Sequence, residues 1–267
     1  MSIRTISLIR LIALATVASA CSASVPLTRS PVATTGGIEC PGATLRTAAD
    51  AAAYAGCDVI NGDLRIAQSD LTELSPLTRL LRVSGTLEVA NNPQLQELTG
   101  LERLTQVGAL EISNNPALAD LDGLGSLQSA RFVTISNNAR LRSLHGLEGL
   151  ESAASVTIQH NGICHTTGLS SLREVGSVVI SNNPKLVSLA GLNGLRRAES
   201  VEVTNNRMLS GYFGLLPRLA AVEHKLMLNS NAGLAKRDVR AVFERVARAA
   251  EQAALTAQVD AHPLGTR

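Results

Sequence analysis

The chain lacks tryptophan, and aromatic residues make up only 2% of it. Proteins that bind single-stranded nucleic acid stack bases on aromatic side chains inside a basic groove. The 267 residues include 24 Lys and Arg against 22 Asp and Glu, and Arg4 and Arg10 lie in the first 20 residues. Without that segment basic and acidic groups are equal in number, so the sequence argues against a nucleic-acid partner.

Patterns typical of catalytic or metal sites are also scarce. There is no glycine-rich phosphate loop, and no nucleophile or carboxylate is arranged around His145, His224 or His262. His160, Cys164 and His165 could supply zinc ligands, but the leucine period predicts that Cys164 faces inward and His165 outward. We therefore expect no catalytic residues, no bound metal and no cofactor.

Aliphatic residues in a regular repeat dominate the sequence instead. With 45% hydrophobic and only 17% charged residues, the chain is not intrinsically disordered. Each repeat reads approximately LxIxNNxxLxxLxGLxxLxxVxx, in which alternating apolar residues predict a short strand and leucines three apart predict a returning limb. The predicted strands begin 22 to 25 residues apart, at Leu64, Leu87, Leu110, Val133, Val156, Val178, Val201 and Leu226.

One repeat cannot bury its own apolar face, so successive repeats must stack. We predict a repeat solenoid: a single-domain, parallel β-helix-like, leucine-rich coil of about eight turns over residues 64–233, with short helical caps at both ends. Buried asparagines should pair backbone groups after each strand, at Asn92, Asn115, Asn138, Asn161, Asn183, Asn206 and Asn231. Glycines should allow a positive φ or a close backbone approach, at Gly100, Gly123, Gly146, Gly168, Gly191 and Gly214.

Both ends of the stack carry cap signals. Thr47 with Asp50 resembles a capping box and Gly56 a helix stop, which predicts a helix over residues 48–55 within an N-terminal cap of residues 40–63.

The C-terminal cap is predicted for residues 234–258, with a tail over 259–267. Its helix should run from Lys236 to about Thr256 and turn one apolar face to the solenoid, through Val239, Val242, Phe243, Val246, Ala250 and Ala253. A basic amphipathic helix lying on a membrane is the alternative.

The N-terminus carries an export signal. Residues 1–20 have a basic start and an apolar run too short to cross about 30 Å of hydrocarbon, which is typical of a signal peptide. Ala18, Ser19, Ala20 and Cys21 resemble a bacterial lipobox, which implies lipidation of Cys21, and Ser22 would by the same resemblance favour outer-membrane sorting. The small residues Ala18 and Ala20 would equally suit ordinary signal peptidase and simple secretion.

Residues 21–39 are rich in serine, threonine, proline and glycine and predict a lipidated flexible tether. A disordered N-terminus without lipid would have the same sequence character. We therefore expect a bacterial cell-envelope protein, anchored at the outer membrane by its lipid or otherwise secreted or periplasmic.

The repeat resembles leucine-rich repeats, and its opening, with Cys40, a short helix, Cys57, Val59 and Ile60, is similar to the receptor L domain family. The resemblance covers Cys40 to about Asn231 and implies a right-handed parallel coil with an N-terminal disulfide cap. It therefore implies a Cys40–Cys57 disulfide. Cys164 remains unpaired and, counted from Leu118 and Leu141, should fill a core leucine position as a buried thiol. Because the later cysteines and aromatic features of receptor L domains are missing, hormone recognition is not implied.

The outward face of the strands is the surface that solenoids generally use for binding. It is predicted to carry small and weakly polar side chains, among them Ala90, Ser113, Ser136, Gln159, Val179, Ser181, Glu202, Thr204, Lys225 and Met227. Phe132 is the only aromatic there, so a ligand site should centre on Phe132 and Thr134, flanked by Glu111 and Thr157. We expect an envelope or extracellular protein or glycan as partner; the alternative is a structural or adhesion element without a discrete ligand site.

Overall fold

The computed structural model describes residues 37–211 and 215–261, and the side chains among them up to residue 252. The predicted signal peptide, the lipidated Cys21, most of the tether, Gly214 and His262 lie outside the described residues.

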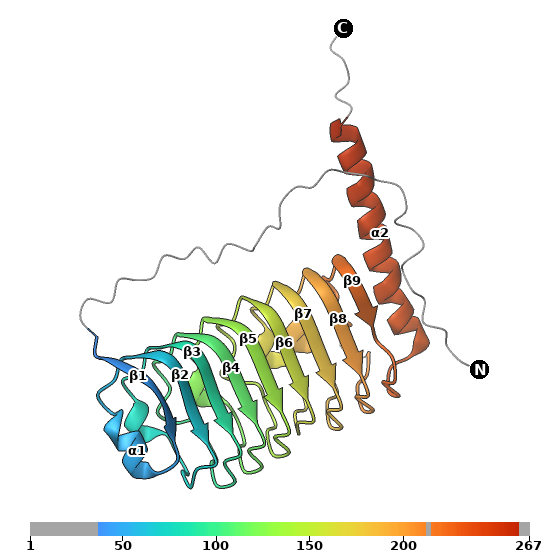
Figure 1. Ribbon diagram of the computed structural model, residues 1–267. Coiled ribbons are helices and arrows are strands. Elements are labelled where there is room, and N and C mark those ends of the chain that lie inside the picture. The colour runs from blue at the N-terminus through green and yellow to red at the C-terminus, as the bar shows by residue number, and fades with distance from the viewer. Residues whose placement is uncertain (1–36, 212–214, 262–267) are drawn as a thin grey trace. The chain divides into compact units, whose positions relative to one another are not determined.

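The predicted solenoid is confirmed. Its strands form one parallel sheet in which each strand pairs with the next along the chain, as Figure 1 shows. The strands are β1 (Glu39–Leu45), β2 (Val59–Ala67), β3 (Arg82–Ala90), β4 (Gln106–Ser113), β5 (Ser129–Ser136), β6 (Ser152–Gln159), β7 (Glu174–Ser181), β8 (Arg197–Thr204) and β9 (Ala221–Met227).

The strands begin four or five residues before the predicted starts. In β4, Val107 and Leu110 both point into the core, with Gly108 and Ala109 between them. This spacing of three breaks the strict alternation of a strand, so the sequence pattern conceals the first half of each one. The backbone is nevertheless paired there, since Val107 lies opposite Ala130 of β5.

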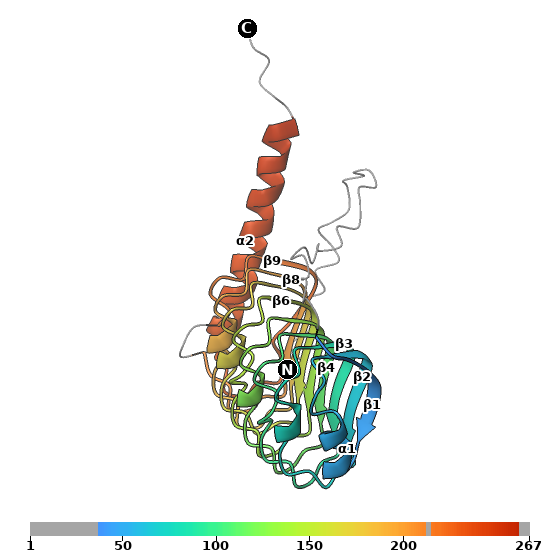
Figure 2. The same cartoon turned by 90° about the vertical axis from the view of Figure 1, so that its left-hand side faces the viewer.

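The interior is filled by aliphatic side chains from the strands and from the returning limb. The limb contains the short 3-10 helices η2 (Ser75–Leu77), η3 (Asp122–Leu124), η4 (Thr167–Leu169) and η5 (Ala190–Leu192). Figure 2 shows the coils closing around this interior, with the strands on one side. Coils are numbered from the one that contains β2, so the third contains β4 and the fifth contains β6. The leucines of the third coil, Leu118, Leu121, Leu124 and Leu127, are all fully buried, as the repeat pattern predicts.

The asparagines form the predicted buried ladder. The backbone N–H of Asn115 donates to Oδ1 of Asn138 at 3.0 Å, and Nδ2 of Asn138 donates to the carbonyl of Ile112 at 3.1 Å. The same two bonds recur from coil to coil up to Asn231. Ser69 opens the ladder in the first coil by donating its N–H to Oδ1 of Asn92.

The turn glycines meet both predicted needs, and Gly100 and Gly146 meet both at once, since a Cβ at either would also collide with the backbone of the preceding coil. Gly100 and Gly146 have φ values of +116° and +104°, which glycine adopts without strain. At Gly123, a Cβ would collide with the backbone carbonyl of Leu98 in the preceding coil. Close approach of successive coils therefore requires glycine here.

The N-terminal cap contains a helix and a strand. Helix α1 (Ala48–Ala53) begins with the predicted capping box between Thr47 and Asp50 and ends slightly earlier than predicted. Backbone N–H groups of Arg46 and Thr47 lower the pKa of Asp50. Strand β1, which the sequence did not predict, includes Glu39 from the expected tether. Pro41 and a bulge between Pro41 and Ala43 make this edge strand a poor template for aggregation.

A disulfide and a carboxylate fasten β1 to the first coil. The structure joins Cys40 to Cys57, whose Cα atoms are 5.9 Å apart. Asp58 is 5% exposed, accepts a hydrogen bond from the N–H of Ile38 at 2.8 Å and pairs with Arg79 at 3.1 Å. The hydrogen bond from Ile38 in particular, aided by Arg79, lowers the pKa of Asp58 although desolvation opposes it.

Helix α2 (Lys236–Ala261) covers the other end beside β9 (Figure 1). Val242 and Val246 are buried in the common core, with Val239 and Phe243 packed around them. Ala250 is exposed, contrary to the prediction, because the helix runs on beyond its contact with the solenoid. Among the described helices, none is long and apolar enough to span a membrane.

Candidate functional site

The four residues predicted to bind a ligand lie together on three neighbouring strands. Glu111 of β4 is the register partner of Thr134 of β5, which is the partner of Thr157 of β6. Phe132 precedes Thr134 by two residues and therefore points to the same side of the sheet. The strand pattern thus placed these residues correctly, and the flat sheet brings them into one patch.

Phe132 projects from this patch. Its register partners are Ala109 and Ser155, whose short side chains leave Phe132 45% exposed. The guanidinium carbon of Arg131 lies 5.2 Å from the centre of the ring, within the range of a cation–π contact. The result is a partly solvated aromatic group beside a positive charge.

Glu111 differs from its acidic neighbours on the same row. Glu88 pairs with Arg65 at 3.2 Å, and Glu202 pairs with Lys225 at 2.6 Å. Glu111 is exposed and has neither a hydrogen bond nor an ion pair to any other described residue. Its carboxylate is therefore available to a ligand without breaking a contact within the protein.

The exposed face is narrower than predicted. Ala90, Ser113, Ser136, Ser181 and Thr204 were expected outside but are buried, because the chain turns into the asparagine ladder at the end of each strand. A second outward row runs through Phe132 instead, and of its members the sequence analysis placed only Phe132 and Lys225 outside. It consists of Thr86, Ala109, Phe132, Ser155, Ser177, Ser200 and Lys225.

The face is flat. The two best-formed hollows in the described part of the chain lie elsewhere, one against α2 around Arg245 and Arg248, the other beside η2 around Asp70 and Glu73. Neither touches the strand face. A ligand of this face would therefore be held by surface contacts around Phe132 rather than enclosed.

The prediction for Cys164 is wrong. Ile163 is fully buried at the core position, and Cys164 is only partly buried beside it. The fifth coil is one residue short, and the missing residue lies between Asn161 and the core position, so counting from Leu141 overshoots by one. His160 and His165 are both exposed, and residues 37–211 and 215–252 contain no cluster of three His, Cys, Asp or Glu that could hold a metal ion.

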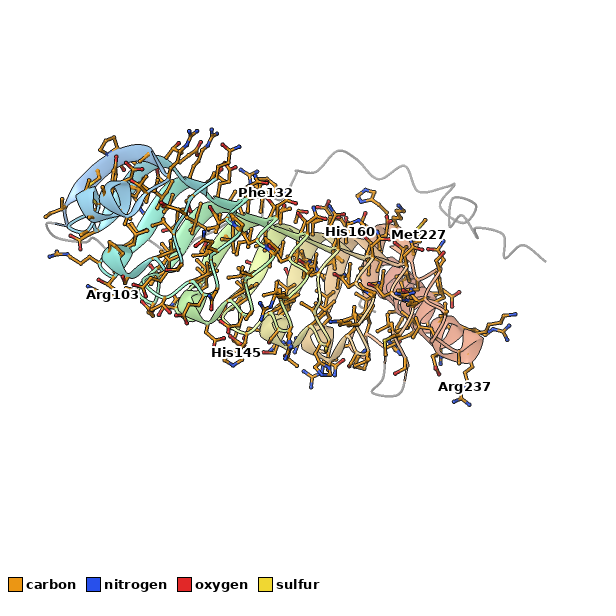
Figure 3. All side chains as sticks on the ribbon, turned by 90° about the horizontal axis from the view of Figure 1, so that it is seen from below. Arg103, Phe132, His145, His160, Met227 and Arg237 are labelled. Atoms are coloured by element: carbon orange, nitrogen blue, oxygen red, sulfur yellow. A yellow bond between two sulfur atoms is a disulfide. The ribbon has the colours of Figure 1, made fainter. Side chains whose placement is uncertain are left out.

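Another histidine, His145, lies on the opposite edge. Nδ1 of His145 is 3.2 Å from Asp122, and Nε2 is 3.5 Å from Glu148. All three side chains are substantially exposed. Figure 3 shows Phe132 and His160 along one edge of the solenoid and His145 with Arg103 along the other. The histidine therefore cannot act on a ligand bound at Phe132.

The comparisons agree with this architecture. No curated protein matches the chain. The family model described as "Receptor L domain" matches residues 56–146, which extend from before β2 to beyond β5 and include Cys57, Glu111, Phe132 and Thr134. Stacked solenoid repeats generally present an extended binding surface. The resemblance to receptor L domains is thereby confirmed over residues 56–146.

Proposed function

We propose that this protein is an exported cell-envelope lipoprotein whose solenoid binds a protein or glycan through the strand face around Phe132. The exposed Phe132 ring in a flat field of small side chains carries the proposal. Exposed aromatic groups are frequent anchors of binding surfaces, and flat faces suit extended ligands better than small molecules.

The polar groups around Phe132 give the patch the means to recognise a ligand. The carboxylate of Glu111 can accept hydrogen bonds, whereas the hydroxyls of Thr134 and Thr157 can donate or accept them. Arg131 adds a cation beside the ring. Such a combination is suited to sugar hydroxyls or to polar side chains of a partner.

Two features support export. The Cys40–Cys57 disulfide is typical of proteins from oxidising compartments. The lipobox-like residues before Cys21 support lipid attachment at that cysteine, followed by a tether that leads to the folded part.

Binding is tested by screening the purified protein against envelope proteins and glycans. Specific, saturable binding is expected, and Phe132→Ala and Thr134→Arg should each weaken it by more than about 1 kcal/mol with a nearly unchanged thermal midpoint. Met208→Ala is the matched control, because Met208 is 55% exposed but lies away from the strand face. Equal affinity of wild type and both face variants would move the site elsewhere, and absence of any saturable binding would leave a structural or adhesion role.

Lipidation is tested by metabolic labelling with an alkynyl fatty acid. The wild-type chain should incorporate the label, and Cys21→Ser should not. Retained label in Cys21→Ser would contradict the anchor but leave the binding proposal intact.

A further inference from the structure

Charges on one side of the solenoid are separated by sign along its length. This side, here called the turn strip, consists of the residues that follow strands β2 to β8. Its seven ranges are 68–74, 91–98, 114–121, 137–144, 160–166, 182–189 and 205–211. The strands end at the lower edge of Figure 1, and Figure 3 views the molecule from that edge.

The charged Asp, Glu, Lys and Arg residues of the first three ranges are all acidic, and those of the last four, which lie in 137–144, 182–189 and 205–211, are all basic. The acids are Asp70, Glu73, Glu97 and Asp120, and the bases are Arg140, Arg142, Lys185 and Arg207. Both histidines of the turn strip, His160 and His165, also fall in the basic part. Asp120 is half-buried and the other seven charged residues are exposed.

A backbone ladder holds these charges in register. The N–H of Arg142 donates to the carbonyl of Ala119 at 3.1 Å, and the N–H of Cys164 donates to the carbonyl of Arg142 at 3.1 Å. Successive coils are therefore stacked about 4.8 Å apart here as well. Like charges on neighbouring coils repel at this distance, and none of the eight forms an ion pair within the described residues.

We propose that the turn strip is the interface of an antiparallel homodimer. A surface with one acidic and one basic half is complementary to a second copy of itself turned by 180°. With the two-fold axis between the third and fourth ranges, Asp120 faces Arg142 of the second copy, and Glu73 faces Lys185. Each contact occurs twice, so the dimer is closed and does not extend into a filament.

The dimer leaves the strand face free. Phe132 lies on the strands, whereas the turn strip follows them, so the two surfaces are separate parts of the coil. The inference is thus independent of the proposed ligand site, and either can fail without the other.

Sedimentation velocity of the purified full chain tests the dimer. A dimer is expected at about 0.1 M salt and mostly monomer at about 1 M, where the Debye length falls from about 10 Å to about 3 Å. Arg142→Glu with Lys185→Glu, and separately Glu73→Lys with Asp120→Lys, should each raise the dimer dissociation constant at least about tenfold. An equal mixture of the two doubly substituted proteins should restore the dimer, since each reversed charge then meets its reversed counterpart.

The matched control is Arg196→Glu with Arg218→Glu, because both arginines are exposed and lie outside the turn strip. It should leave the dimer unchanged, and near-wild-type thermal midpoints would show that all variants fold. Carbodiimide cross-linking should join Lys185, one of three lysines in the chain, to Glu73 or Asp70 of the other copy. The proposal would be overturned if the wild-type protein were monomeric, or if neither charge reversal changed the dimer dissociation constant. A monomeric wild type would mean that the turn strip binds a different partner.

Discussion

The side-chain oxygen of Asn138 accepts a hydrogen bond from the backbone N–H of Asn115, one coil earlier, at 3.0 Å. Removing the Asn138 amide by substitution with alanine would leave this N–H and the carbonyl of Ile112 unpaired inside the protein. Each buried unpaired group costs about 1–3 kcal/mol. Asn138→Ala should therefore lower the free energy of unfolding by at least about 2 kcal/mol, measured by urea denaturation.

The preceding residue is the control. Asn137 is exposed and has a φ of +57°, a conformation that glycine adopts easily. Asn137→Gly should change the free energy of unfolding by less than about 0.5 kcal/mol. Equal losses of unfolding free energy in Asn138→Ala and Asn137→Gly would mean that the asparagine ladder does not stabilise the coil.

Ile163 and Cys164 should respond very differently to truncation. Ile163 is fully buried, so Ile163→Ala should cost about 2–5 kcal/mol, whereas Cys164→Ala should cost less than about 1 kcal/mol. Alkylation of the native protein should modify Cys164 slowly without prior unfolding. A larger loss of unfolding free energy for Cys164→Ala than for Ile163→Ala would mean that Cys164 occupies the core position, as the sequence analysis predicted.

Thr166 is a defect in the leucine stack. It occupies the position of Leu144 and Leu189, is fully buried, and its hydroxyl has no hydrogen-bond partner within the described residues. Thr166→Val keeps the shape and removes the unpaired group, so it should raise the free energy of unfolding by about 1 kcal/mol. A destabilised variant would show that the hydroxyl is paired in solution.

Asp58 should make the N-terminal cap sensitive to acid. Its pKa is lowered below the ordinary 3.8, chiefly by the N–H of Ile38 and further by Arg79 and Arg103. The folded state therefore binds this proton less readily than the unfolded state, so the stabilisation is complete above that ordinary value and is lost as pH falls through the lowered one. Asp58→Asn should reduce stability at neutral pH and weaken its acid dependence.

Denaturation measured from pH 2 upward, at about one-unit intervals, would check this. Glu151→Gln is the control, because Glu151 is exposed and its carboxylate contacts no described residue. If the unfolding free energy of Asp58→Asn fell at low pH in the same way as that of the wild type, the contacts of Asp58 would contribute nothing to the stability of the cap.

The leucine period was sufficient to predict the solenoid, because every leucine three residues apart had to face the same interior. It could not place the missing residue of the fifth coil, since counting permits a gap on either side of Ile163 and only packing decides between them. Strand β1 also escaped prediction, because Pro41 and Gly42 are poor strand formers and the strand is held by pairing with β2.

The sequence could predict which residues of the candidate site lie beside one another on the outward face of the strands. Alternation with Val133 and Ile135 placed Phe132 and Thr134 outside, and the repeat placed Glu111 and Thr157 beside them. The row of Ser155 and Ser177 was missed because it lies in the part of each strand where alternation breaks. The cation–π contact of Arg131 and the unpaired state of Glu111 depend on side-chain geometry that no sequence period contains.

The ligand-binding role of the strand face is tested most directly by photo-cross-linking in cells that produce the full chain. A benzophenone amino acid in place of Phe132 should form a discrete cross-linked product with a protein partner. If the ligand is a glycan from the screen, adding that glycan should instead reduce cross-linking at this position. The same group in place of Arg103, which is exposed on the opposite edge (Figure 3), should give neither. Identical results at both positions would contradict a binding site centred on Phe132.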